Sequence, residues 1–89
     1  MPKVGFTANI QRHVRCPEMV VAGHTVREAL DNVFAANPLA RGYVLDDQAA
    51  LRKHIVVFVN GTTITDRTRL TDPVDEAAVI TIFQALSGG

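Results

Sequence analysis

The sequence predicts an α+β fold in which a mixed sheet of four to five strands is covered on one face by one main helix, at about residues 26–36. Three observations support this fold class. Apolar residues alternate with polar ones near the N-terminus, they repeat at helical spacing after Thr25, and an Asn60-Gly61 pair separates two β-rich runs. With 89 residues, of which 47% are hydrophobic, the chain is expected to be a single domain, residues 1–89, with a flexible tail at 85–89.

The segment KVGFTANIQ, residues 3–11, is expected to form the first strand. Its apolar residues occupy every second position: Val4, Phe6, Ala8 and Ile10. A period of two with one polar face indicates a strand that is covered on one side only. A short second strand at about residues 18–22 is expected to pair back against the first.

The main helix is predicted by a capping signal and by periodicity. Thr25 is an N-cap candidate, and Glu28 stands three residues later, which completes a capping box. Apolar residues then recur at positions that share one face of a helix: Val26, Ala29, Leu30, Val33 and Phe34. Pro38 disfavours the helical conformation at Asn37, so the helix is expected to end near residue 36.

Residues 39–54 give the weakest pattern in the chain. We expect an irregular strand at residues 43–45, a turn at Asp46-Asp47 and a helical turn at residues 48–53. The next run, IVVFV, is followed by Asn60-Gly61 and TTIT, which is the strongest short-range signal for a β-hairpin. A turn at residues 71–75 precedes the last strand, AAVITIFQ.

This order of elements is typical of a β-grasp (ubiquitin-like) sheet around one helix. Because side chains alternate between the faces of a strand, Val79, Thr81 and Phe83 are expected to point away from the helix, and Val56 and Phe58 likewise. Such an uncovered apolar surface usually marks a partner site. The predicted partner-binding residues are therefore Phe58, Val79, Phe83 and, beyond the strand, Leu86. The alternative is that residues 39–54 fold over this surface.

Composition and spacing exclude several function classes. Nine basic and nine acidic residues cancel, which argues against nucleic-acid or anionic-membrane binding, and no apolar run approaches the roughly 18 residues of a membrane helix. The single cysteine suits a reducing cytoplasm. The three histidines lie far apart without ligands at metal-binding spacing, and the acidic pairs consist of adjacent residues that point apart. We therefore expect no metal site, no bound cofactor and no catalytic activity of the chain by itself.

The Gly88-Gly89 pair follows the last strand without a linker. Glycine has no Cβ, so a diglycine end can enter a channel as narrow as the backbone. A partner enzyme can then convert the terminal carboxylate into a mixed anhydride with AMP, which a sulfur or amine nucleophile attacks. The alternative is an inert frayed tail.

The segments "VFVNGTTI", "LTDPVDEAAVITI" and "FQALSGG", in this order, resemble the MoaD/ThiS sulfur carriers, which are ubiquitin-like proteins of cofactor biosynthesis. The resemblance implies that a ThiF/MoeB-type activating enzyme uses ATP to adenylate Gly89, the catalytic position. A sulfur donor then forms a thiocarboxylate, and a downstream synthase subunit takes the sulfur. Ser87 and Gly88 are expected to thread the partner's channel, with Leu86 at its mouth.

The resemblance leaves the pathway open. Molybdopterin synthesis is the first expectation, with thiamine, cysteine and siderophore synthesis as alternatives. Gln84-Ala85 stands where many molybdopterin-type members have Pro-Pro or Pro-Ala, and the extra length around residues 39–54 resembles both the MoaD-like and the cysteine-biosynthetic carriers. The same terminus also suits a protein modifier that is conjugated through Gly89. A non-catalytic interaction module is the third possibility.

Overall fold

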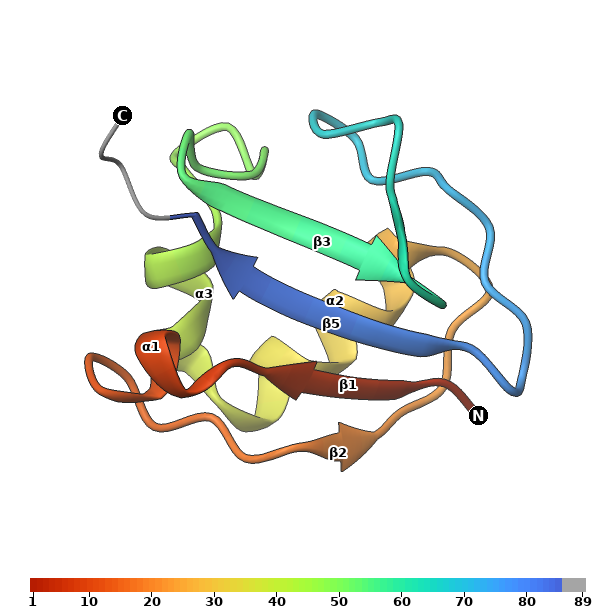
Figure 1. Cartoon of the computed structure of the whole chain (residues 1–89), viewed down its shortest axis with the longest axis horizontal. Helices are drawn as coiled ribbons and strands as arrows, with labels where there is room; N and C mark the ends of the chain where they lie inside the picture. Colours follow the sequence, from red (N-terminus) through yellow and green to blue (C-terminus); the bar gives the residue numbers. More distant parts are fainter. Residues whose placement is uncertain (86–89) are drawn as a thin grey trace.

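A single five-stranded sheet forms one layer of the fold (Figure 1). The computed structural model describes residues 1–85. The strands, in the order β2-β1-β5-β3-β4 across the sheet, are β1 (Lys3–Phe6), β2 (Met19–Val20), β3 (Ile55–Val59), β4 (Thr62–Thr63) and β5 (Val79–Gln84). β1 and β5 run parallel, and all other neighbouring pairs are antiparallel. This mixed sheet is the predicted β-grasp fold.

The main helix, α2 (Val26–Ala36), lies across one face of the sheet, with the bounds that its capping signal predicts (Figure 1). The Oγ1 atom of Thr25 accepts a hydrogen bond from the backbone N–H of Glu28 at 3.2 Å. The Glu28 carboxylate in turn accepts from the N–H of His24 at 2.9 Å, one residue before the expected partner of a capping box. All five residues of the apolar stripe are buried.

The hydrophobic core lies between α2 and the sheet. Alternate residues of the parallel strands β1 and β5 face it: Val4, Phe6, Ile80 and Ile82. Within residues 1–85 no polar or charged residue is fully buried. The core is therefore purely apolar, as the period of two in the strands and the stripe on the helix require.

The predicted hairpin is confirmed. β3 and β4 pair antiparallel, with Val59 opposite Thr62. The two turn residues between them have positive φ angles, 52° at Asn60 and 84° at Gly61. Two consecutive residues with positive φ define the type I′ turn that Asn-Gly favours.

The first strand is shorter than predicted. β1 ends at Phe6, and residues 8–11 form a helical turn, α1 (Ala8–Gln11). Ala8 is exposed, whereas Ile10 is fully buried. Since Phe6 and Ile10 are four residues apart, they fit both a strand period and one turn of helix, and the sequence period does not distinguish the two. The predicted second strand forms, and it is only two residues long.

The prediction for residues 39–54 is wrong in two places. Instead of a strand at 43–45 the chain forms a third helix, α3 (Pro38–Val44), which buries Ala40 and Val44. Pro38 is its first residue, a position where the missing N–H of proline has no cost. No helical turn forms at 48–53. The predicted turn at Asp46 is present, because the Asp46 carboxylate accepts from the N–H groups of Gln48 and Ala50.

Candidate functional site

The face of the sheet that is turned away from α2 carries an uncovered apolar surface. We call its residues, from β3 and β5, the outer patch: Val56, Phe58, Val79, Thr81 and Phe83. Val79 is 43% exposed and Phe83 39%, whereas their neighbours Ile80 and Ile82 are fully buried. The predicted alternation along β5 is therefore observed, and residues 39–54 do not cover this face.

Two aromatic rings form the centre of the outer patch. Phe58 lies opposite Thr81, and Phe83 lies opposite Val56, so the two phenylalanines are diagonal neighbours on adjacent strands. Their ring centroids are 6.3 Å apart and the planes cross at 65°, which is an edge-to-face contact. Cross-strand pairs of this kind fix the orientation of both rings, so the patch has a defined shape before any partner binds.

The chain is held firmly where β5 ends. The N–H of Ala85 donates a hydrogen bond to the carbonyl of His54 at 2.7 Å. The hydroxyl of Tyr43, in α3, donates to Oε1 of Gln84 at 2.8 Å. The ring of His13 stacks on Tyr43 with 5.6 Å between centroids. Segments from three parts of the sequence therefore set the position at which the chain leaves the sheet.

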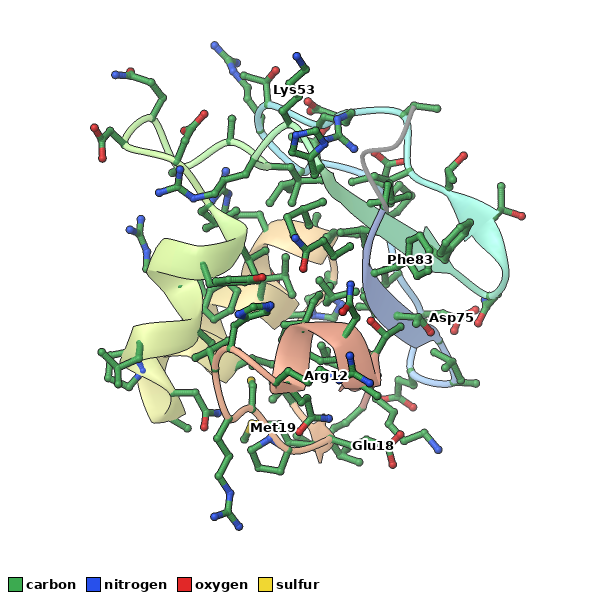
Figure 2. All side chains as sticks on the ribbon, turned by 60° about the vertical axis from the view of Figure 1, so that its left-hand side comes forward. Arg12, Glu18, Met19, Lys53, Asp75 and Phe83 are labelled. Carbon is green, nitrogen blue, oxygen red and sulfur yellow. The ribbon has the colours of Figure 1, made fainter. Side chains whose placement is uncertain are left out.

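A hollow of about 350 Å³ lies between α1 and the end of β5. Its lining residues are Thr7, Asn9, Arg12, Phe83 and Gln84. Figure 2 shows Arg12 next to α1 and Phe83 on β5. Phe83 thus belongs both to the outer patch and to this hollow, which makes the two surfaces continuous.

The predicted site residues separate into two groups. Phe58, Val79 and Phe83 are brought together on one face. Leu86, Ser87, Gly88 and Gly89 lie outside the described residues, so their roles stay predictions.

Two other side chains that could be reactive, Cys16 and Asp75, are in positions that indicate a structural role. Cys16 is fully buried, and loss of solvation raises the pKa of its thiol to about 11, so it remains neutral at physiological pH. The Asp75 carboxylate accepts from the N–H of Ala77 and shapes a turn. In the described part of the chain, no three His, Cys, Asp or Glu side chains are grouped so that they could hold a metal ion. None of its helices has the length and hydrophobicity needed to cross a membrane.

Sequence reasoning missed Arg12, Tyr43 and His54, which surround the end of β5. Pro38 is the sequence signal that could have located Tyr43, because proline is favoured at the first position of a helix. A helix that begins at Pro38 has Ala40 and Val44 on its buried side and Tyr43 at the edge of that side. No local pattern marks His54, because its contribution is a backbone carbonyl.

A β-grasp sheet with an uncovered apolar face next to the end of its last strand is the architecture of ubiquitin-like carriers and modifiers. The comparisons with known proteins agree. The model of the ThiS family matches residues 10–89, and the chain belongs to this family of ubiquitin-like sulfur carriers. Among curated proteins, no sequence matches the chain.

Several solved structures share the fold over nearly the whole chain. SAMP1 from Haloferax volcanii is 25% identical, with a TM-score of 0.77 over 99% of this chain and 98% of that one. A chain of the Amycolatopsis orientalis BexX/CysO complex is 22% identical, with a TM-score of 0.82 and full coverage of both chains. CysO from Mycobacterium tuberculosis is 15% identical, with a TM-score of 0.79 over 97% of this chain and all of that one. The last two comparisons show a common fold.

Proposed function

We propose that the protein is a sulfur carrier whose Gly89 carboxylate is adenylated by a partner enzyme and converted into a thiocarboxylate. The observation that carries the proposal is the ThiS family match, which runs through Gly88 and Gly89. The firmly held end of β5, next to an exposed apolar patch, supports it. The proposal requires a mature chain that ends at Gly89, which the intact mass of the purified protein tests.

The chemistry begins on the partner. The Gly89 carboxylate attacks the α-phosphorus of ATP, and pyrophosphate leaves. The acyl adenylate then has AMP as a good leaving group, and a sulfur nucleophile at the oxidation level of hydrosulfide displaces it to give the terminal thiocarboxylate. The carrier contributes no acid or base to these steps. A ThiF/MoeB-type activating enzyme supplies the ATP site.

Covalent geometry limits how the partner can bind. Residues 86–89 follow the last described residue, and four residues span at most about 14 Å when fully extended. A partner that contacts Phe58, Val79 and Phe83 must therefore hold its nucleotide within that distance of Ala85. In this arrangement Leu86 lies at the mouth of the partner's channel, while Ser87 and Gly88 pass through it.

The recipient of the sulfur is a synthase subunit in the cytoplasm, and molybdopterin synthesis is the first pathway to test. The resemblance of the segment from about residue 51 to 89 to the MoaD-like carriers motivates this choice. Addition of the thiocarboxylated protein to a molybdopterin synthase large subunit should yield product; no product would redirect the search to the cysteine, thiamine or siderophore pathways.

The activation step is tested by ATP–pyrophosphate exchange with the ThiF/MoeB-type enzyme of the same organism. The full chain should support exchange, and a chain without Gly89 should not. Thermal unfolding of the shortened chain should equal that of the full chain, which shows that loss of exchange does not result from loss of the fold. Exchange that persists without Gly89 would overturn the proposal.

The outer patch is tested by Phe83→Ala. About 80 Å² of this side chain is exposed if a phenylalanine offers ~200 Å² in total, and burying it against a partner contributes about 2 kcal/mol. The KM for the carrier should therefore rise roughly 30-fold. Leu39→Ala is the matched control, because Leu39 is 85% exposed on α3, outside the outer patch. Equal effects of the two substitutions would refute the docking role.

A protein modifier is the second candidate, which the 25% identity to SAMP1, a small archaeal modifier protein, favours. In this function an amine of a target lysine, instead of sulfur, attacks the Gly89 adenylate. Mass spectrometry separates the two functions: a carrier gains the mass of one oxygen-to-sulfur exchange at its terminus, whereas a modifier leaves diglycine remnants on lysines of other proteins.

A further inference from the structure

We propose that the hollow around Arg12 is an anion subsite of the docking surface, and that it receives a carboxylate side chain from an acidic region of the activating enzyme. The inference rests on the function proposed above and adds the chemistry by which that partner is recognised. Three features support it: the distribution of charge, the free guanidinium of Arg12, and the composition of the hollow.

The charges of this neutral chain are separated in space. Five of the nine basic residues lie on the segments around the end of β5, namely Arg12, Arg15, Arg41, Arg52 and Lys53. Only two of the nine acidic residues, Asp46 and Asp47, share that end. Figure 1 shows α1, α3 and the loop before β3 together at the end of the sheet where β5 stops. The end from which residues 86–89 emerge is therefore positive, although the net charge is zero.

Arg12 differs from three of the other arginines of the folded part. Arg27, Arg52 and Arg67 donate side-chain hydrogen bonds to backbone carbonyls. Among the four arginines whose side chains have no hydrogen-bond partner within residues 1–85, which are Arg12, Arg15, Arg41 and Arg69, it is Arg12 that lines the hollow. Within residues 1–85 the one ion pair joins Lys3 and Glu18, and no described residue accepts a hydrogen bond from the Arg12 side chain. Its five N–H donors remain available, and their planar arrangement fits the two oxygens of a carboxylate.

The hollow offers further donors next to Arg12. Because the Tyr43 hydroxyl donates to Oε1 of Gln84, the Nε2 amide of Gln84 keeps its two donors. Asn9 adds a second amide to the lining, and Phe83 forms the apolar side. A volume of about 350 Å³ admits an Asp or Glu side chain. Cationic and amide donors beside an aromatic ring match a carboxylate whose methylene groups rest on Phe83.

The occupant is a protein side chain, not a nucleic acid phosphate. A nucleic-acid site needs a stripe of basic residues along the backbone path, whereas a single arginine lines the hollow. The hollow also continues into the outer patch, whose exposed valine and phenylalanine side chains suit a protein surface. An acidic partner residue at the rim of an apolar contact fits both features.

The test compares Arg12→Glu, Arg12→Gln and Arg12→Lys with Arg69→Glu in the full chain. Arg69 is exposed in the loop between β4 and β5, and its side chain has no partner among the described residues. The substitution Arg69→Glu makes the same change of charge as Arg12→Glu. The dissociation constant for the ThiF/MoeB-type enzyme is measured by calorimetry without ATP, at about 0.05 M and 0.5 M salt. Circular dichroism checks that each variant is folded.

Arg12→Glu should raise the dissociation constant about tenfold or more, and Arg12→Gln by roughly threefold to tenfold, while Arg69→Glu should change it less than about twofold. Arg12→Lys should lie between wild type and Arg12→Gln, since lysine keeps the charge and loses the planar donors. High salt should reduce these differences, because it screens exposed charges. In pyrophosphate exchange the KM should rise and kcat should remain unchanged.

Equal effects of Arg12→Glu and Arg69→Glu, or wild-type protein that does not bind the enzyme, would overturn the inference. An Arg12-dependent affinity for single-stranded DNA that exceeds the affinity for the enzyme would also overturn it. Failure of the proposed function looks different: wild-type protein binds the enzyme in an Arg12-dependent way, but it supports no pyrophosphate exchange.

Discussion

Arg27 connects three segments through carbonyl groups instead of through a carboxylate. Its Nη2 atom donates to the carbonyl of Ala49 at 2.6 Å and to that of Thr68 at 3.3 Å, and Nε donates to the carbonyl of Arg69 at 3.1 Å. The first turn of α2 is thereby tied to the loop that precedes β3 and to the loop at residues 66–70. The first of these loops leads to His54, whose carbonyl holds Ala85.

The size of this contribution follows from the exposure of the bonds. The bond to Ala49 is partly buried, and a hydrogen bond from a charged donor there contributes about 1.5 kcal/mol. The other two bonds are exposed, and each contributes about 0.5 kcal/mol. Arg27→Met keeps the aliphatic stem and loses all three bonds, so it should lower the unfolding free energy by about 2.5 kcal/mol. Arg27→Lys can satisfy the Ala49 carbonyl alone and should lose about 1 kcal/mol, the contribution of the two exposed bonds.

Urea denaturation measures the free energy, and thermal unfolding of Arg27→Met should occur at a midpoint more than about 10 °C lower for a domain of this size. Arg69→Met is the control, because its side chain makes no hydrogen bond within residues 1–85 and only its backbone takes part. The difference between the two variants should persist at about 0.5 M salt, since no ion pair is involved. Equal unfolding free energies for Arg27→Met and Arg69→Met would refute the reasoning.

Substitutions at three further positions have defined outcomes. Thr25→Ala should lower the unfolding free energy by about 1 kcal/mol in urea denaturation, since Oγ1 caps α2, and Thr25→Ser should restore most of it. The pKa values of Asp66 and Asp72 are lowered, the first mainly by the Thr71 hydroxyl and the second mainly by the N–H of Thr65. Their stabilisation is therefore full above about pH 4 and is lost as the pH falls through the lowered values, so Asp66→Asn should flatten the acid limb of a stability–pH curve. Cys16, whose pKa is raised to about 11, should react with iodoacetamide at pH 8 only as fast as the protein unfolds, and Cys16→Ala should remove the loss of stability between about pH 9 and 11.

The sequence predicted those parts of the fold that local signals determine. The Thr25 cap and the stripe from Val26 to Phe34 mark the position of α2 in the sequence, and packing of that stripe on the sheet stabilises it. The Asn60-Gly61 turn likewise specifies its hairpin. The region of α3 was not predictable in this way, because a helix of seven residues has too few turns for a periodic signal, and its burial against α2 decides its conformation.

The parts of the candidate site that follow from local sequence were predicted, and the parts that depend on contacts between distant residues were not. Parity along β5 follows from strand geometry, and it placed Val79 and Phe83 on the outer face. The contacts at the end of the strand join residues far apart in the sequence, such as Tyr43 with Gln84 and His54 with Ala85. These contacts depend on where α3 and the loop before β3 lie, so they could not be derived before that region was known.

The position of β5 within the sheet limits how deeply a partner can draw the chain. β5 pairs on one side with β1 from Val79 to Ile82 and on the other side with β3 from Ile80 to Gln84. Drawing even Gln84 into a channel would break a ladder pair and expose its neighbours, whereas the residues after Ala85 carry no such cost. Pulling on an edge strand would break hydrogen bonds to one neighbouring strand, whereas pulling on the central strand β5 would break hydrogen bonds to both β1 and β3. The partner must therefore reach Gly89 within the length of residues 86–89, and a variant with two residues inserted after Ala85 should still be adenylated, while deletion of Leu86 and Ser87 should prevent adenylation without changing the fold.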